Sequence, residues 1–153
     1  MSVVSAPEVE GVLARIDREE LVTLALDLAN IDSPTGQEGP VADYLMTTLR
    51  GWGLAPRAVA LLPERPNVVA RLRGTGSGCS LIFNSHMDTT IAKDETWVTP
   101  RAADPIFHSG WRDGDYLVGN GICNNKGPMA CWLIAAKAIH ESGVRLRGDL
   151  ILT

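Results

Sequence analysis

A short apolar run in the middle of the chain, Ser80-Leu81-Ile82-Phe83-Asn84, limits the fold more than any other feature. It is too short for an ordinary helix, and it lacks the alternation of polar and apolar residues that marks a strand with one solvated face. The pattern is typical of a strand buried on both faces, as in sheets that are covered by helices. It therefore predicts an α/β fold.

Helical and strand-like segments alternate on both sides of this run, which supports the same fold class. Apolar residues recur at helical spacing in three segments, which predict a long first helix and two others: 7–31, 38–50 and 126–142. Strand patterns are found in four more segments: 55–62, 67–73, 116–118 and 148–153. The stretch 89–115 shows no periodicity and is expected to be mostly loop. The sequence shows no internal repeat and no second domain.

The chain stops inside the last strand-like segment, residues 148–153, which read GDLILT. A segment that looks like a central strand needs other elements on both of its faces, and neither a polar tail nor another helix follows this one. We therefore expect the chain to be a fragment of a longer domain.

Composition and charge narrow the classes of partner. The chain has 153 residues, 45% of them hydrophobic and 21% charged, with a formal net charge of −4, which predicts one globular domain. The acidic balance and the lack of a long Lys/Arg cluster argue against nucleic acid or an anionic membrane as partner. The first twenty residues carry too many charges for a signal peptide or a spanning helix, so a cytoplasmic location is expected.

A glycine-rich loop, GNGICNNKGPMA, covers residues 119–130. Two phosphate-binding motifs are excluded. A P-loop needs Ser or Thr after its lysine, whereas Lys126 is followed by Gly127, and a dinucleotide fingerprint needs a third glycine where Asn124 stands. On residue type alone, Lys126 is expected to begin a helix as a solvated charge.

The cysteines and two of the histidines are not expected to form a site. Cys79, Cys123 and Cys131 are odd in number and widely spaced, which predicts neither a disulfide framework nor a cysteine zinc site, so we expect buried or idle thiols. His108 lies in a predicted loop and is expected to be solvated. His140 lies in the last turn of the third predicted helix, where a histidine suits the negative end of the helix dipole.

His86 and Asp88 directly follow the apolar run. Open α/β sheets bind their ligands beyond the carboxyl ends of the strands, and imidazole is the commonest metal ligand in proteins. Residues two apart on an extended segment point to the same side, so one could bind a cation while the other orients it. On spacing alone, a metal ligand and a histidine hydrogen-bonded to its neighbour both stay open.

The order of several motifs resembles one family. The motifs are PTGQEGPVADYL (34–45), NVVARLRG (67–74), LIFNSHMDT (81–89), the loop with Trp97 and Asp104-Pro105, DGDYLVGNGICNNKGPMA (113–130) and GDLILT (148–153). They resemble the metallopeptidases and amidohydrolases that include acetylornithine deacetylase, succinyl-diaminopimelate desuccinylase, aminoacylase and glutamate carboxypeptidase. The resemblance implies the N-terminal portion of a zinc-peptidase-like catalytic domain, with a mixed sheet flanked by helices.

By matching position, the resemblance also implies roles for three residues. His86 would be a zinc ligand, Asp88 would act in catalysis by orienting that ligand from behind, and Asn124 would stand where the family has an aspartate that bridges two zinc ions. A carboxylate can give one oxygen to each of two cations, whereas a carboxamide offers a single neutral carbonyl oxygen. We therefore expect a weakened site that holds one zinc ion or another divalent metal. The substrate-binding residues are unknown.

The resemblance implies a domain that is only partly present. Residues 1–153 would be part of a catalytic domain, without the inserted dimerisation domain and without the C-terminal half, which in the family carries the catalytic glutamate and further ligands. General-base loss costs about 10²- to 10⁴-fold in rate, so the isolated chain is not expected to be a competent hydrolase.

Two functions are therefore weighed. The first is the N-terminal part of a metal-dependent hydrolase that acts on amide bonds of N-acyl amino acids or small peptides. The second is a catalytically lapsed family member that binds a ligand or a partner. A homodimer and a complementing second chain are both left open.

Overall fold

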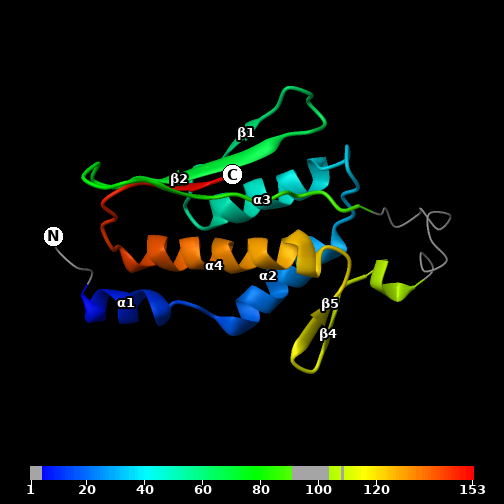
Figure 1. Ribbon diagram of the computed structural model, residues 1–153, viewed down its shortest axis with the longest axis horizontal. Coiled ribbons are helices and arrows are strands. Elements are labelled where there is room, and N and C mark those ends of the chain that lie inside the picture. The colour runs from blue at the N-terminus through cyan, green and yellow to red at the C-terminus, as the bar shows by residue number, and fades with distance from the viewer. Residues whose placement is uncertain (1–4, 91–103, 108) are drawn as a thin grey trace.

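The computed structural model describes residues 5–90, 104–107 and 109–153. A four-stranded sheet lies on one side of this part of the molecule, and the α-helices lie together on the other side (Figure 1). The helices are α1 (Ala6–Leu13), α2 (Arg18–Asn30), α3 (Gly39–Gly51) and α4 (Gly127–Ser142). Shorter helical turns cover Pro105–Phe107, a 3-10 turn, and Ile122–Lys126, a π turn that leads directly into α4.

The sheet is mixed and has the strand order β1-β2-β6-β3. Its strands are β1 (Arg57–Val59), β2 (Asn67–Leu72), β3 (Leu81–Phe83) and β6 (Leu150–Leu152). The β1–β2 and β2–β6 pairs are antiparallel, whereas β3 and β6 are parallel. Thus β6, the last segment of the chain, is a central strand with partners on both sides, as its apolar sequence predicts. The expected α/β class and mixed sheet are confirmed.

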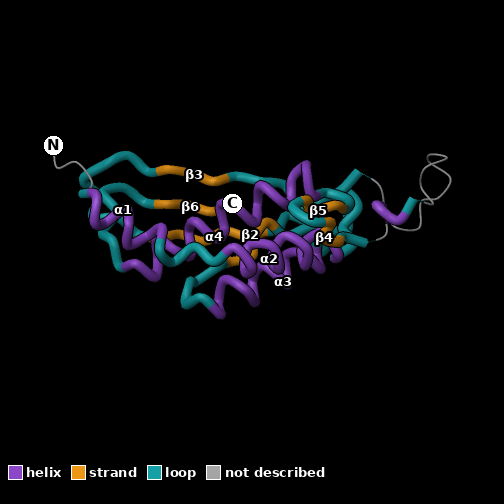
Figure 2. Tube along the Cα trace, turned by 90° about the horizontal axis from the view of Figure 1, so that it is seen from below, coloured by secondary structure: helices purple, strands orange, loops and turns teal. Residues whose placement is uncertain are grey.

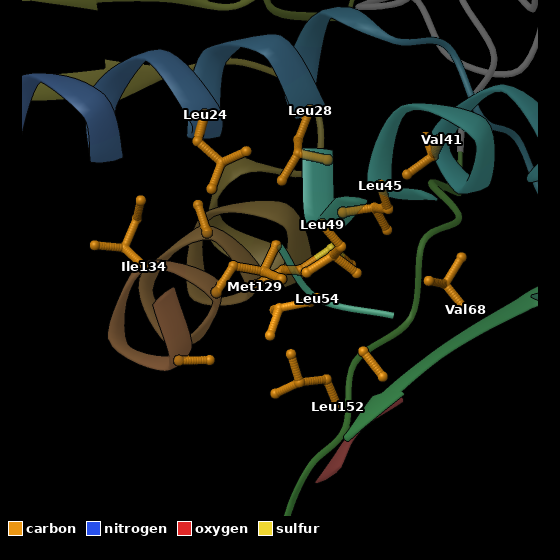
Figure 3. Close-up of a cluster of buried hydrophobic side chains, with 14 of the residues drawn as sticks. Leu24, Leu28, Val41, Leu45, Leu49, Leu54, Val68, Met129, Ile134 and Leu152 are labelled. Atoms are coloured by element: carbon orange, nitrogen blue, oxygen red, sulfur yellow. The ribbon is translucent and has the colours of Figure 1, made fainter. Parts of the chain in front are cut away.

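The core lies between the sheet and the helices. Alternate residues of β2 and β6 point into it, and they meet one face of α3 and the inner face of α4 (Figure 3). Residues that are at most 2% exposed include Leu28, Val41, Leu49, Ala70, Met129, Leu133 and Leu152. On the helical side, the Lys137 ammonium pairs with a Glu20 carboxylate oxygen at 2.6 Å and joins α4 to α2.

The prediction of one long first helix is wrong. The helix is interrupted between Leu13 and Arg18. A second helix begins there because the Asp17 side chain accepts hydrogen bonds from the backbone N–H groups of Glu19 (2.7 Å) and Glu20 (3.2 Å). An aspartate in this position caps a new helix, and the first helix has already ended at Leu13, with Ala14 as its C-cap. Helical periodicity continues across the break, which is why the pattern alone did not reveal it.

The prediction that 80–84 is buried on both faces is also wrong. Leu81 and Ile82 are 56% and 57% exposed. The strand lies at the edge of the sheet, and the α-helices all lie on one side of that sheet (Figures 1 and 2). Its apolar sequence is that of an inner strand, but Leu81 and Ile82 point to opposite faces, and the described residues leave both of them more than half exposed.

A hairpin that the sequence did not predict follows the long loop. β4 (Trp111–Asp113) pairs with β5 (Tyr116–Val118) through a turn at Gly114, whose φ is +58°. Only β5 was expected. Residues 91–103 and His108, including the predicted solvation of that histidine, lie outside the described residues. In the part of the chain that is described, no helix is long and apolar enough to cross a membrane.

Candidate metal centre

His86 lies just beyond the carboxyl ends of the two parallel strands. The ladder between β3 and β6 continues past the strands, since Thr153 N–H donates to Phe83 O (2.9 Å) and Ser85 N–H donates to Thr153 O (3.1 Å). These bonds fix the backbone up to the residue before His86. The sheet therefore carries this histidine at the edge where α/β proteins bind ligands, as predicted.

Asp88 holds the His86 ring from one side. The ring Nδ1 is 3.0 Å from the Asp88 backbone oxygen and 3.1 Å from the carboxylate Oδ1. Both atoms are hydrogen-bond acceptors, so Nδ1 carries the proton and donates. In a neutral imidazole the other nitrogen, Nε2, then has a free lone pair. The side chains are 47% and 30% exposed, so the pair is accessible from solvent.

Asn124 lies opposite the free nitrogen. Its Oδ1 is 3.1 Å from His86 Nε2, although 38 residues separate the two positions. The peptide bond between Asn124 and Asn125 is cis. The structure thus brings together all three residues predicted for the site, His86, Asp88 and Asn124.

Two glycines shape the loop that carries Asn124. Gly121 has a φ of +81°, and a Cβ on it would lie 3.1 Å from both Thr89 Cγ2 and Lys126 Cδ. A Cβ on Gly119, whose φ is +154°, would lie 2.8 Å from Gly110 Cα. Side chains at these positions would be strained and crowded, so glycine lets the loop pack against Thr89 at position 121 and against Gly110 at position 119.

The Nε2–Oδ1 contact brings two lone pairs together when the imidazole is neutral. Nδ1–H is already directed to Asp88, and a carboxamide oxygen only accepts hydrogen bonds. The contact becomes favourable if the imidazole carries a second proton, if the amide turns its NH₂ toward Nε2, or if both atoms ligate one cation. The arrangement is therefore consistent with two metal ligands on adjacent corners of one site.

The donor set supplies only part of a metal site. Zinc usually takes four ligands, of which at least three come from protein. Across residues 5–90, 104–107 and 109–153, no three His, Cys, Asp or Glu side chains gather into a group that could hold a metal. His86 and Asn124 fit a divalent cation as a pair, with Asp88 behind the histidine, but a complete site needs donors beyond the described residues.

The segment before α3 contacts the site from the far side and was not predicted. Thr35 Oγ1 donates to Asp88 Oδ2 at 2.5 Å. Pro34 and Thr89 form a parallel bridge, and Ser33 Oγ donates to Met87 O at 2.8 Å. In the sequence this segment, SPTGQE, shows only the signature of a turn between two helices, so its contacts with the His86–Thr89 segment depend on tertiary structure.

An ion pair anchors the end of that segment. Arg65, in the β1–β2 turn, donates from Nε (3.0 Å) and Nη2 (2.7 Å) to the two carboxylate oxygens of Glu38, whose side chain is 9% exposed. The hydrogen bonds from Arg65 lower the pKa of Glu38 to about 2, against the opposing effect of its burial. A cavity of about 380 Å³ next to this pair is also lined by His86 and Asp88.

Lys126 is not the solvated charge that its residue type predicts. It is 1% exposed, and its ammonium donates to the backbone oxygen of Ile31 at 2.7 Å. Ile31 follows the last residue of α2, where helix carbonyls lack partners in the helix. The contact joins the Asn124 loop to the segment that leads to Thr35. A lysine just before a helix gave no sequence signal for this role.

The remaining candidates are not among the residues that contact His86. Cys79, Cys123 and Cys131 are free thiols and all three are exposed, so they are not buried, and the alternative of idle thiols stays a prediction. His140 is exposed in the last turn of α4, at the position predicted for it.

Comparison with known proteins gives a consistent result. Peptidase family M20/M25/M40 matches residues 82–153. An N-formyl-4-amino-5-aminomethyl-2-methylpyrimidine deformylase of Bacillus subtilis is 37% identical over 142 residues, which are 88% of this chain and 32% of that protein. A succinyl-diaminopimelate desuccinylase of Gluconacetobacter diazotrophicus is 36% identical over 137 residues, which are 86% and 33% of the two chains.

Solved structures show the same fold. Human carnosine dipeptidase 1 superposes with a TM-score of 0.75 at 20% identity, over 97% of this chain and 34% of that one. A Staphylococcus aureus tripeptidase gives a TM-score of 0.68 at 23% identity, over 90% and 36%. The chain therefore spans about a third of the length of the relatives it matches.

Proposed function

We propose, on the premise that this chain belongs to peptidase family M20/M25/M40, that it supplies part of the metal site of a hydrolase that cleaves amide bonds. The observation that carries the proposal is the placement of His86 Nε2 3.1 Å from Asn124 Oδ1, with the Asp88 carboxylate on the other side of the ring. Two residues far apart in sequence thereby direct metal-ligating atoms to the same point.

His86, Asp88 and Asn124 would have different roles in the site. His86 would bind the cation through Nε2, while Asp88 accepts a hydrogen bond from Nδ1–H and so keeps Nε2 unprotonated and correctly oriented. Asn124 would add a neutral oxygen ligand. A zinc ion or another divalent metal, when bound, would polarise the amide carbonyl and acidify a water molecule. The exposure of His86 leaves room for a substrate to approach.

The isolated chain is proposed to lack activity. His86 and Asn124 are two ligands where zinc needs at least three from protein, and no further acidic or histidine side chain among the described residues joins them. We propose that the missing ligands and the general base come from outside these residues, either from the same gene product or from a second chain. The domain would then be one part of a larger catalytic unit.

The substrates are proposed to be small amides. The relatives are named as a deformylase and a desuccinylase, and the similar structures include a dipeptidase and a tripeptidase. All four names describe removal of an acyl group or cleavage of a short peptide. We therefore propose an N-acyl amine, an N-acyl amino acid or a short peptide as substrate.

Asn124 favours a second candidate function. Without a bridging carboxylate the site has one negative charge fewer to balance two cations. A family member that no longer turns over substrate, but still binds a ligand or a partner chain, would tolerate this residue.

The experiment that tests the first function uses the complete gene product that contains this chain. Purified protein should contain about one equivalent of zinc or another divalent metal per chain. It should hydrolyse at least one member of a panel of N-formyl, N-acetyl and N-succinyl amines and dipeptides, and H86A should lose both properties. Absence of metal and of turnover across the panel would contradict the hydrolase and favour the second function.

A further inference from the structure

We propose that Thr35 is a positioning residue for this site: its hydroxyl fixes the Asp88 carboxylate, which in turn holds the His86 ring with Nε2 directed at Asn124. The proposal deepens the proposed function and rests on it for the metal-binding test. A second test, on the metal-free protein, does not depend on the metal.

The two oxygens of the Asp88 carboxylate have different partners. Oδ2 accepts the Thr35 hydroxyl at 2.5 Å, and Oδ1 lies 3.1 Å from His86 Nδ1. A carboxylate can rotate about its Cβ–Cγ bond with little resistance, since this torsion is broad. A donor on one oxygen removes that freedom. Thr35 therefore determines which oxygen faces the ring and in which plane.

Thr35 is itself held by backbone hydrogen bonds to the segment that contains Asp88. Thr89 N–H donates to Ser33 O at 2.8 Å, and Thr35 N–H donates to Thr89 O at 3.3 Å. Ser33 and Thr89 are 0% and 5% exposed, so the bond between them is shielded from water, whereas Thr35 itself is exposed. These backbone hydrogen bonds hold the segment of Thr35 beside the segment of Asp88, so that the Thr35 hydroxyl faces the Asp88 carboxylate.

The Glu38–Arg65 ion pair fixes the other end of the turn. Glu38 Oε1 accepts the Gly36 N–H at 2.9 Å as well as Arg65 Nη2 at 2.7 Å. The turn that carries Thr35 is therefore tied on one side to the His86–Thr89 segment and on the other to the β1–β2 turn. This double attachment leaves Thr35 with little freedom to move away from Asp88.

The chemistry requires a hydroxyl at position 35. Valine has the shape of threonine but cannot donate, whereas serine can donate without the methyl group. Residues that orient a metal ligand typically change metal affinity about 10- to 100-fold when removed. Thr35 contacts Asp88 and not the metal ligand His86 itself, so we expect a smaller effect: T35V should weaken zinc binding about 3- to 10-fold.

A double-mutant cycle on the complete gene product that contains this chain separates positioning from a general structural role. Zinc dissociation constants are measured by competition with a chromophoric chelator for wild type, T35V, D88A and the double variant. If Thr35 acts through Asp88, T35V has no further effect once Asp88 is absent. T35S should restore the wild-type constant. T47V, an exposed threonine of α3, is the matched control and should bind zinc as wild type does.

Two results overturn the proposal: T35V binds zinc as tightly as wild type, or its effect adds fully to that of D88A. Circular dichroism verifies that each variant is folded, and T35A replaces T35V if that variant is not. If wild type binds zinc no better than H86Q does, the proposed metal site fails instead, and the metal-free test decides the role of Thr35.

That test uses ¹⁵N-labelled histidine in the metal-free chain. Spectra are recorded at pH about 8.5, above the reference pKa of imidazole near 6.5, and the His86 signals are assigned by their loss in H86Q. The wild-type spectrum should show a protonated Nδ1 and an unprotonated Nε2. In T35V the two nitrogens should move toward the average of both tautomers, and T35S should reverse the change. Identical spectra for wild type and T35V would overturn the proposal without reference to metal.

Discussion

His86 Nε2 and Asn124 Oδ1 lie 3.1 Å apart, and in a neutral imidazole whose Nδ1 donates to Asp88 neither atom has a proton to offer the other. A shared cation is one of the few arrangements that makes such a contact favourable. By the resemblance, Asn124 stands where the family has an aspartate. The residue therefore decides how much charge the site can balance.

Restoring the carboxylate should strengthen the site. N124D adds a negative charge next to His86 without changing the size of the side chain, so we expect zinc affinity to rise by about tenfold or more, equivalent to at least about 1.4 kcal/mol. Isothermal titration of the metal-free complete gene product that contains this chain measures the change.

The neighbouring residue supplies the control for that prediction. N125D adds the same charge one position later, where no contact with His86 is found. It should change zinc affinity less than N124D does. Equal gains in the two variants would indicate a general effect of charge and would argue against Asn124 as a ligand.

Acid should weaken the Glu38–Arg65 ion pair. The pKa of Glu38 is about 2 in the folded chain, below its model-compound value of 4.5. The stabilisation is therefore fully present above pH about 4.5 and is lost as the pH falls through about 2. The contribution of ionised Glu38 to the free energy of unfolding is at most about 3 kcal/mol. In urea titrations between pH 6 and 2.5, E38Q should be less stable than wild type at pH 6, and the difference should shrink toward pH 2.5.

Glu64 provides the comparison for Glu38. It lies beside Arg65 in the same turn but is exposed. E64Q should follow the wild-type pH profile. If E38Q and wild type keep the same difference in unfolding free energy across this range, the depressed pKa of Glu38 is not what stabilises the turn.

Removing the buried ammonium of Lys126 should destabilise the chain. K126M keeps the length of the side chain but leaves Ile31 O without this donor, so we expect a loss of about 1–3 kcal/mol in the free energy of unfolding. R50M, which removes an exposed cation from the last turn of α3, is the control and should cost less than about 0.5 kcal/mol. Similar costs in the two variants would show that the Lys126–Ile31 contact contributes little.

The sequence predicted the parts of the site that lie at the ends of regular elements. His86 directly follows a strand, so its position alone placed it at one edge of the sheet, whereas Asn124 was placed beside it only by the resemblance to a family. Thr35 and the Glu38–Arg65 pair were missed because their partners are 53 and 27 residues away, and a turn sequence does not indicate which strand end it will contact.

The errors in the fold have physical causes that a local pattern cannot show. Asp17 divides the first predicted helix by capping a second one, although the apolar spacing continues across it. Leu81 and Ile82 have the sequence of an inner strand, but exposure depends on which elements cover the sheet. Lys126 can be buried because the backbone carbonyl of Ile31, at the end of a distant helix, accepts a hydrogen bond from its ammonium.

Zinc titration of the metal-free complete gene product that contains this chain, wild type against H86Q, tests the metal site most directly. His140 supplies the control, because it is exposed on α4 and makes no part of the group around His86. Wild type and H140Q should bind about one zinc ion with the same affinity, and H86Q should bind it at least about tenfold more weakly. Equal zinc binding by wild type and H86Q would contradict the assignment of His86 as a metal ligand.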